Sequence, residues 1–135
     1  MTSILLAIQK RIVSEVLSDM FQSHADITVY TVPEIGLTVQ FAKAYHPGII
    51  IIEAPEKIGQ QTDEYLKCCA VVRKHLPKSR LVHLWPDKSS TSMIAAMTAL
   101  KAHQVDDFLF CDFTLENVLS TILPSFSIAD ILPNF

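Results

Sequence analysis

The sequence predicts an α/β protein in which a doubly wound, five-stranded parallel sheet is flanked by five helices. Short apolar, β-branched runs alternate five times with longer stretches whose apolar residues recur at helical spacing, all within 135 residues. One run, Ile49–Ile52, contains no polar residue and must therefore be covered on both faces. Short loops and right-handed crossovers make the doubly wound order the simplest closure of such a chain.

The first half of the chain supplies two strand–helix units. Residues 3–8 are an apolar run and predict the first strand, and residues 26–32 are rich in β-branched residues and predict the second. The first helix is expected over 10–23, with an apolar stripe made of Ile12, Val13, Val16, Leu17, Met20 and Phe21. The second is expected over 33–45, where Pro33 fits the first helical turn and the stripe is Leu37, Phe41 and Ala44.

The second half supplies three more units. Strands are expected at 48–53, 79–85 and 106–112. A polar loop over 54–64 leads into the third helix, and the last three helices are expected at 65–76, 89–103 and 114–123. These elements form one domain over residues 1–123, and residues 124–135 are interpreted as a C-terminal tail or the start of a linker.

Composition excludes several classes of protein. The net charge is −3, the pI is about 5.9, and Lys and Arg are scattered, which argues against direct nucleic-acid binding and against an anionic membrane surface. No apolar run approaches the roughly 20 residues that span a bilayer. The N-terminus has no signal-peptide pattern, and three cysteines without one predict a reducing compartment and a cytoplasmic location.

Glu53 stands where the most buried strand ends. In doubly wound sheets, ligands and chemistry lie outside the carboxyl ends of the strands, so the strand pattern places Glu53 at such an end without assigning it a function. We expect the carboxylate to be ionised and partly solvated. Its nearest cations in this topology would be Lys10, after the first strand, and Lys88, after the fourth.

Two segments, "AKAYHPGIIIIEAP" (42–55) and "VDDFLFCDF" (105–113), together with the order and lengths of the elements, resemble receiver domains of bacterial response regulators, the CheY-like family. The similarity covers about residues 3–123. It implies a flavodoxin-like, three-layer sandwich of the receiver type. By position, Glu53 falls where that family has its phosphate-accepting aspartate, and the family's acidic pair falls on Ile8 and Gln9.

Further along, the family's hydroxyl residue falls on Trp85, its lysine on Cys111, and its aromatic switch residue on Phe108. Phosphoryl transfer to a carboxylate needs Mg²⁺, which takes oxygen ligands, and Ile8 offers none. Cys111 cannot supply the positive charge of a lysine. The resemblance is therefore to a degenerate receiver, or pseudo-receiver, and we expect no enzymatic activity, no metal and no cofactor.

The leading interpretation is a regulatory domain of a bacterial two-component signalling system that works by phosphorylation-independent protein–protein interaction. The family resemblance implies that a protein partner or a second copy binds at the fourth helix, fifth strand and fifth helix, whose outer faces carry Thr98, Lys101, Glu116 and Ser120. An effector module could follow residue 135. Two alternatives stay open: a still phosphorylatable regulator of a phosphorelay, and an α/β domain that binds a small molecule at the strand ends.

Other reactive side chains favour structural roles. Cys68 and Cys69 are adjacent on a helix, about 100° apart, which favours core packing over metal binding. His83 lies inside a strand and is expected to be a hydrogen-bonded, buried or half-buried side chain. Asp106 and Asp107 point to opposite faces of a strand, so they are expected to be solvated strand-entry residues and not a catalytic pair.

Overall fold

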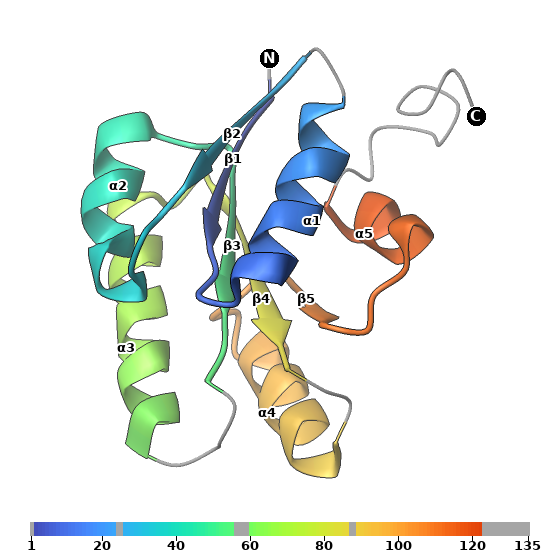
Figure 1. Ribbon diagram of the computed structural model, residues 1–135. Coiled ribbons are helices and arrows are strands. Elements are labelled where there is room, and N and C mark those ends of the chain that lie inside the picture. The colour runs from blue at the N-terminus through green and yellow to red at the C-terminus, as the bar shows by residue number, and fades with distance from the viewer. Residues whose placement is uncertain (1, 24–25, 56–59, 87–88, 123–135) are drawn as a thin grey trace.

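The computed structural model describes residues 2–23, 26–55, 60–86 and 89–122. Within these ranges lies a five-stranded parallel sheet in the order β2-β1-β3-β4-β5 (Figure 1). Its strands are β1 (Thr2–Ala7), β2 (Ile27–Thr31), β3 (Ile49–Glu53), β4 (Arg80–Trp85) and β5 (Asp107–Phe110). The doubly wound parallel sheet predicted from the sequence is confirmed, and β5 is an edge strand.

The helices form a layer on each side of the sheet. They are α1 (Arg11–Gln22), the short 3-10 helix η1 (Ile35–Leu37), α2 (Thr38–Tyr45), α3 (Gln60–His75), α4 (Ser90–Lys101) and α5 (Leu115–Ile122). Figure 1 shows α1 and α5 together on one side of the sheet, and α2 and α3 together on the other. Buried residues of α4 belong to the same core cluster as those of α2 and α3. The three-layer sandwich follows from this arrangement.

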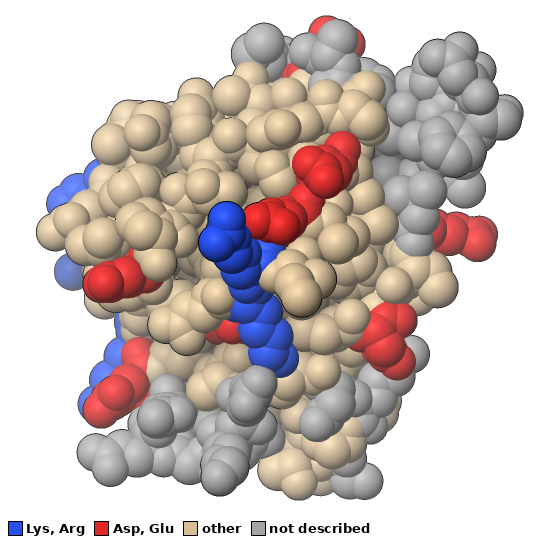
Figure 2. Space-filling view, in the orientation of Figure 1, with Lys and Arg blue, Asp and Glu red and all other residues tan. Residues whose placement is uncertain are grey.

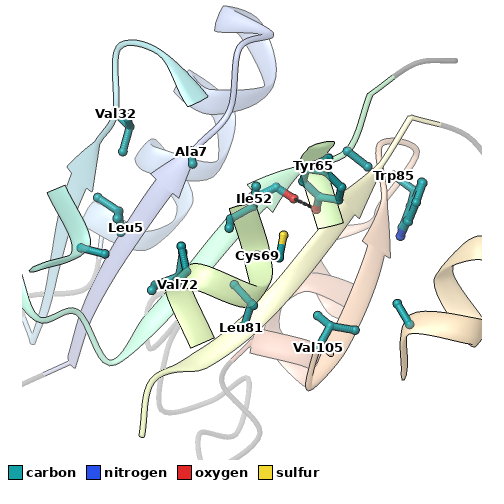
Figure 3. Packing of buried hydrophobic residues seen from close by; sticks show 14 of the residues in the cluster. Leu5, Ala7, Val32, Ile52, Tyr65, Cys69, Val72, Leu81, Trp85 and Val105 are labelled. Atoms are coloured by element: carbon teal, nitrogen blue, oxygen red, sulfur yellow. Dashed lines mark hydrogen bonds between the residues drawn. The ribbon is translucent and has the colours of Figure 1, made fainter. Parts of the chain in front are cut away.

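The fully apolar run of β3 separates two hydrophobic cores. Ile50 and Ile52 pack on the side of α2, α3 and α4, whereas Ile49 and Ile51 pack on the side of α1 and α5. Figure 3 shows Ile52 within the first of these cores. All four side chains are buried. Each contributes about 1.5–3 kcal/mol through removal of apolar surface from water. This double burial is the physical reason why the run has no polar position.

Helix α1 exposes part of the stripe that its sequence predicts to be buried. Leu17 and Phe21 are buried, but Ile12 is 77% exposed and Val16 is 41% exposed. The predicted stripe was therefore too wide. The sheet covers one narrow side of this helix, and Ile12 and Val16 lie one turn apart outside it.

Two helix starts also differ from the expectation. The segment after Pro33 forms η1 first, and α2 starts only at Thr38. The Thr38 hydroxyl donates to the Ile35 carbonyl at 2.6 Å, which stabilises this short turn. Within α2, Ala44 is exposed and Ala42 is buried, so the predicted stripe was misplaced there. Helix α3 begins at Gln60, five residues before the predicted start. The prediction missed these residues because the first turn of the helix is wholly polar and shows no apolar period.

Two arginine–aspartate ion pairs hold the end of the sheet where β4 and β5 begin. Arg73 of α3 contacts Asp106 at 2.8 Å, and Arg80 contacts Asp107 at 3.2 Å. Asp106 also accepts from the Leu81 backbone N–H at 2.8 Å. The two aspartates do not share a site, as predicted, but they are ion-paired and not simply solvated.

Charged residues are scattered over the face of the molecule seen in Figure 2, which is mostly uncharged. Among the described helices, none combines the length and the continuous apolar character that crossing a bilayer requires.

Candidate functional site

The carboxyl ends of β1 and β3 lie side by side, and Glu53 is the last residue of β3. The strand stays in the sheet to its end: Glu53 is in register with Leu84, and the Ala54 N–H donates to the Leu84 carbonyl at 2.7 Å. As a result Glu53 is only 6% exposed. The expectation of a partly solvated carboxylate was wrong. Of its two proposed cationic neighbours, Lys10 lines the same pocket, and Lys88 lies outside the described residues.

The residues at the positions that correspond to a receiver's phosphorylation site differ in burial and lie on different sides of the sheet. Ile8 is buried in the core on the side of α1 and α5, whereas Gln9 is exposed. Trp85 is fully buried on the opposite side of the sheet. Cys111 is half-buried, and its N–H donates to the Trp85 carbonyl at 2.9 Å. Ile8 and Trp85 thus fill the two hydrophobic cores and do not face a common polar site.

No three His, Cys, Asp or Glu side chains within the described ranges come together in a way that could hold a metal ion. The Cys69 thiol is buried, as predicted, but Cys68 is half-buried at the edge of a pocket and was assigned to the core incorrectly. Burial raises the pKa of Cys69 to about 12 and that of Cys68 above its usual value. Both thiols are therefore protonated at neutral pH and are weak nucleophiles.

Tyr65, His83 and Trp85 form a buried aromatic cluster between α3 and β4. The ring centroids of Tyr65 and His83 are 5.1 Å apart, and the Trp85 ring lies 6.2 Å from Tyr65 and 6.1 Å from His83 in edge contacts. The Tyr65 hydroxyl donates to the Ile52 carbonyl at 3.1 Å (Figure 3). This hydrogen bond fixes the tyrosine ring over the end of β3.

His83 is fully buried, and neither of its ring nitrogens has a hydrogen-bond partner among the described groups. The expectation of a hydrogen-bonded histidine was therefore wrong. The indole N–H of Trp85 is also buried without a hydrogen-bond partner among the described groups. Burial, with a smaller contribution from the Arg73 guanidinium, lowers the pKa of His83 to about 4. The one sequence signal of this cluster is a lone histidine within the apolar run of β4.

The outer side of α4, β5 and α5 combines short polar side chains with exposed apolar ones. Phe108 is half-buried, and its ring makes an edge contact with Phe110 at 5.6 Å. The four residues assigned to a partner face by resemblance are all exposed: Thr98, Lys101, Glu116 and Ser120. Three exposed apolar side chains of α4 were missed by sequence reasoning: Met93, Ile94 and Met97. The signal was present, because "SMIAAMTAL" is apolar around most of the helix.

A pocket of about 730 Å³ opens at the carboxyl ends of β1 and β3, on the side of α3. We call it the β1–β3 pocket. Its described polar lining residues are Gln9, Lys10, Glu53 and Glu64, and its wall includes Ile35, Gly36, Pro55, Tyr65 and Cys68. Gly36 lies in η1, which follows β2, so the segments after β1, β2 and β3 all contribute to the pocket. Sequence reasoning located Glu53 and Lys10 here but missed Gly36, Glu64 and Tyr65.

The sequence matches no protein-family model and no curated protein. Solved structures do match. A chemotaxis protein of Vibrio cholerae is similar at a TM-score of 0.68 and 16% identity, over 88% of this chain and 93% of that one. A response regulator from Thermotoga maritima gives 0.69 and 13%, over 87% and 91%. A DNA-binding response regulator of the LuxR family from Staphylococcus aureus gives 0.69 and 17%, over 90% and 96%. The chain therefore has the fold of response-regulator receiver domains, as its sequence resemblance implied.

Proposed function

We propose that this chain is a non-enzymatic regulatory domain that acts through protein–protein contact and does not use phosphorylation of a carboxylate. The observation that carries this proposal is the burial of Ile8 and Trp85 in the hydrophobic cores. At these positions a receiver needs a metal-binding acid and a phosphate-binding hydroxyl. Phosphoryl transfer also requires a positive charge close to the oxygens of the transferred group, which Cys111 cannot provide.

The surface proposed for the contact is the outer side of α4 with β5 and α5. Met93, Ile94 and Met97 are 41%, 68% and 44% exposed, and they lie within little more than one turn of α4. Adjacent exposed apolar side chains are typical of contact surfaces, and methionine adapts its shape to a partner. Phe108 is half-buried in β5, a strand that α4 contacts, and without phosphorylation nothing would switch it chemically. The contact would therefore be constitutive.

The proposed occupant is a second copy of this chain. Lys101 of α4 and Glu116 of α5 are both exposed and carry opposite charges. In a two-fold symmetric dimer each residue of one copy can face the other residue of the second copy, so both charge pairs form at once. The exposed apolar residues of α4 would then be buried between these pairs.

Treatment with acetyl phosphate and Mg²⁺ is expected to leave the intact mass unchanged. Ile8 cannot coordinate Mg²⁺, and Gln9 offers only a neutral carbonyl oxygen. The measurement is intact-protein mass spectrometry, with a phosphorylatable receiver treated in parallel as the positive control. A stoichiometric phosphoryl increment located at Glu53 would instead establish the phosphorylatable alternative.

Ile94→Glu is expected to weaken self-association at least about tenfold, because it removes the burial of one large apolar side chain and introduces a charge. Charge reversal by Lys101→Glu alone should also weaken it, and adding Glu116→Lys should restore part of the loss if the two residues face each other. Sedimentation velocity over a concentration series measures the effect.

Ile12→Glu is the matched control, since Ile12 is the same residue type and at least as exposed as Ile94 but lies on α1. Circular dichroism melts should be nearly unchanged for all four variants. A dimer that persists in Ile94→Glu, or that is lost only in Ile12→Glu, would place the interface elsewhere.

A further inference from the structure

Helix α4 directs small side chains towards the core and larger apolar ones towards solvent. Ala96 and Ala99 are buried in the core that the sheet shares with α2 and α3. Met93, Ile94 and Met97 are exposed. Changes to exposed side chains usually alter the unfolding free energy little, whereas changes in the core alter it strongly. The chemistry of Met93 and Met97 can therefore change at the surface without loss of the fold.

The backbone of α4 is fixed at the end that carries the methionines. Ser89 caps the helix: its hydroxyl accepts from the Ser92 N–H at 3.2 Å, and its carbonyl accepts from the Met93 N–H at 2.9 Å. Met93 and Met97 are four residues apart, and Ile94 and Met97 are three apart, so they are neighbours on the helix surface. Two thioether groups and one branched side chain thus form a continuous apolar strip on a fixed helix.

Methionine is unevenly distributed over the chain. Of the four methionines, Met1 lies outside the described residues, and Met20 is half-buried against the core on the side of α1 and α5. Both exposed methionines of the described ranges are therefore on α4. The Cys68 and Cys69 thiols compete poorly for an oxidant, because burial raises their pKa and keeps them protonated at neutral pH.

We infer that Met93 and Met97 form an oxidation site for hydrogen peroxide, and that their conversion to methionine sulfoxide releases the proposed dimer. The inference rests on that dimer. In each oxidation the thioether sulfur attacks one oxygen of the peroxide, so that an S–O bond forms and the O–O bond breaks. The transferred oxygen passes its proton to the leaving hydroxide, which departs as water. The sulfur loses two electrons and the peroxide gains them.

The sulfoxide has opposite consequences in the two states of the chain. On the monomer its oxygen is solvated by water. In the dimer it would lie beside Ile94 and its copy, where an acceptor without a hydrogen bond is costly. A two-fold dimer holds four such groups, two from each copy. Association should therefore weaken at least about tenfold. Because the dimer covers the methionines, the monomer is the form that is oxidised.

Treatment of the full chain with hydrogen peroxide tests the inference. Dithiothreitol is added afterwards to reverse the reversible oxidation of the three cysteines. Peptide mapping by mass spectrometry should show one added oxygen on Met93 and on Met97 before any on Met20. Sedimentation velocity should then show dimerisation weakened at least about tenfold, with the melting temperature of the monomer nearly unchanged. Two methionine sulfoxide reductases, one for each sulfoxide epimer, should restore both the mass and the dimer.

The double variant Met93→Leu with Met97→Leu keeps the apolar volume but cannot be oxidised at these positions. It should form the dimer as the natural sequence does and keep it after peroxide. Met20→Leu is the matched control, and peroxide should still release its dimer.

Two outcomes would overturn the inference and leave the proposed dimer standing: full oxidation of Met93 and Met97 with unchanged association, or release of the double variant by peroxide. Oxidation of Met20 before the α4 methionines would overturn the site itself. A chain that is monomeric before treatment would instead contradict the proposed function, and the inference would fail with it.

Discussion

Lowering the pH from 6.5 to 4 is expected to remove about 3 kcal/mol of unfolding free energy through His83 alone. Burial, and to a smaller extent the Arg73 guanidinium, lowers the pKa of His83 to about 4 in the folded protein, from 6.5 for the free side chain. Between these values the unfolded chain binds a proton that the folded protein does not. Stability from this group is therefore complete above pH 6.5, decreases as the pH falls, and is exhausted at about pH 4.

His83→Phe should flatten this part of the stability profile, because a benzene ring keeps the contacts with Tyr65 and Trp85 but cannot be protonated. Urea unfolding at half-unit pH intervals measures the difference between the variant and the natural sequence, in which the carboxylates common to both cancel. His75→Gln is the control, since His75 is exposed on α3. His83→Leu is a second variant in case the larger ring is not accommodated. If both His83 variants showed the same dependence of unfolding free energy on pH as the wild type, His83 would not be the acid-sensitive group.

Trp85→Ala is expected to destabilise the fold by about 3–5 kcal/mol, the usual range for removal of a fully buried tryptophan. Trp85 is fully buried and contacts Tyr65 and His83 by ring edges. Trp85→Phe should cost less than about 1.5 kcal/mol, because it retains most of the ring volume and removes an indole N–H that has no partner among the described groups.

Denaturant melts followed by circular dichroism measure both variants. Fluorescence cannot serve, because Trp85 is the single tryptophan of the chain. If Trp85→Ala lowered the unfolding free energy less than Trp85→Phe, burial of the Trp85 side chain would not stabilise the fold. Trp85 would then not act as a core residue. The expected order, in contrast, means that a small hydroxyl residue at this position would require repacking of the core.

The sequence predicted the parts of the fold that depend on periodicity. Ile49–Ile52 has no polar position, and burial on both faces follows directly from that run. Helix α3 was placed five residues too late, because a polar first turn has no period to detect. Ile12 was assigned to the core because spacing on a helix gives the direction of its apolar side but not the width of the surface that covers it.

The candidate site depends on how deeply its side chains are buried, and local sequence patterns do not predict that burial. Glu53 looks like the first solvated residue after a strand, but continued pairing of β3 with β4 keeps it buried. His83 looked like an ordinary buried histidine with hydrogen bonds, and only the packing of Tyr65 and Trp85 around it shows that it has none among the described groups. Gly36 and Glu64 join the pocket from segments distant in sequence, so local patterns could not connect them.

The ion pairs at the start of β4 and β5 affect how the molecule opens. Arg80 binds Asp107 of β5 at 3.2 Å and also donates to the Ile122 carbonyl at the end of α5 at 3.3 Å. Arg73 of α3 forms an ion pair with Asp106, the residue before β5. A four-residue edge strand would ordinarily fray independently of the sheet. Here Arg80 of β4 joins the edge strand to the end of α5. We therefore expect the β5–α5 segment to open together with β4, so that its amide hydrogens exchange more slowly than those of an edge strand that frays by itself.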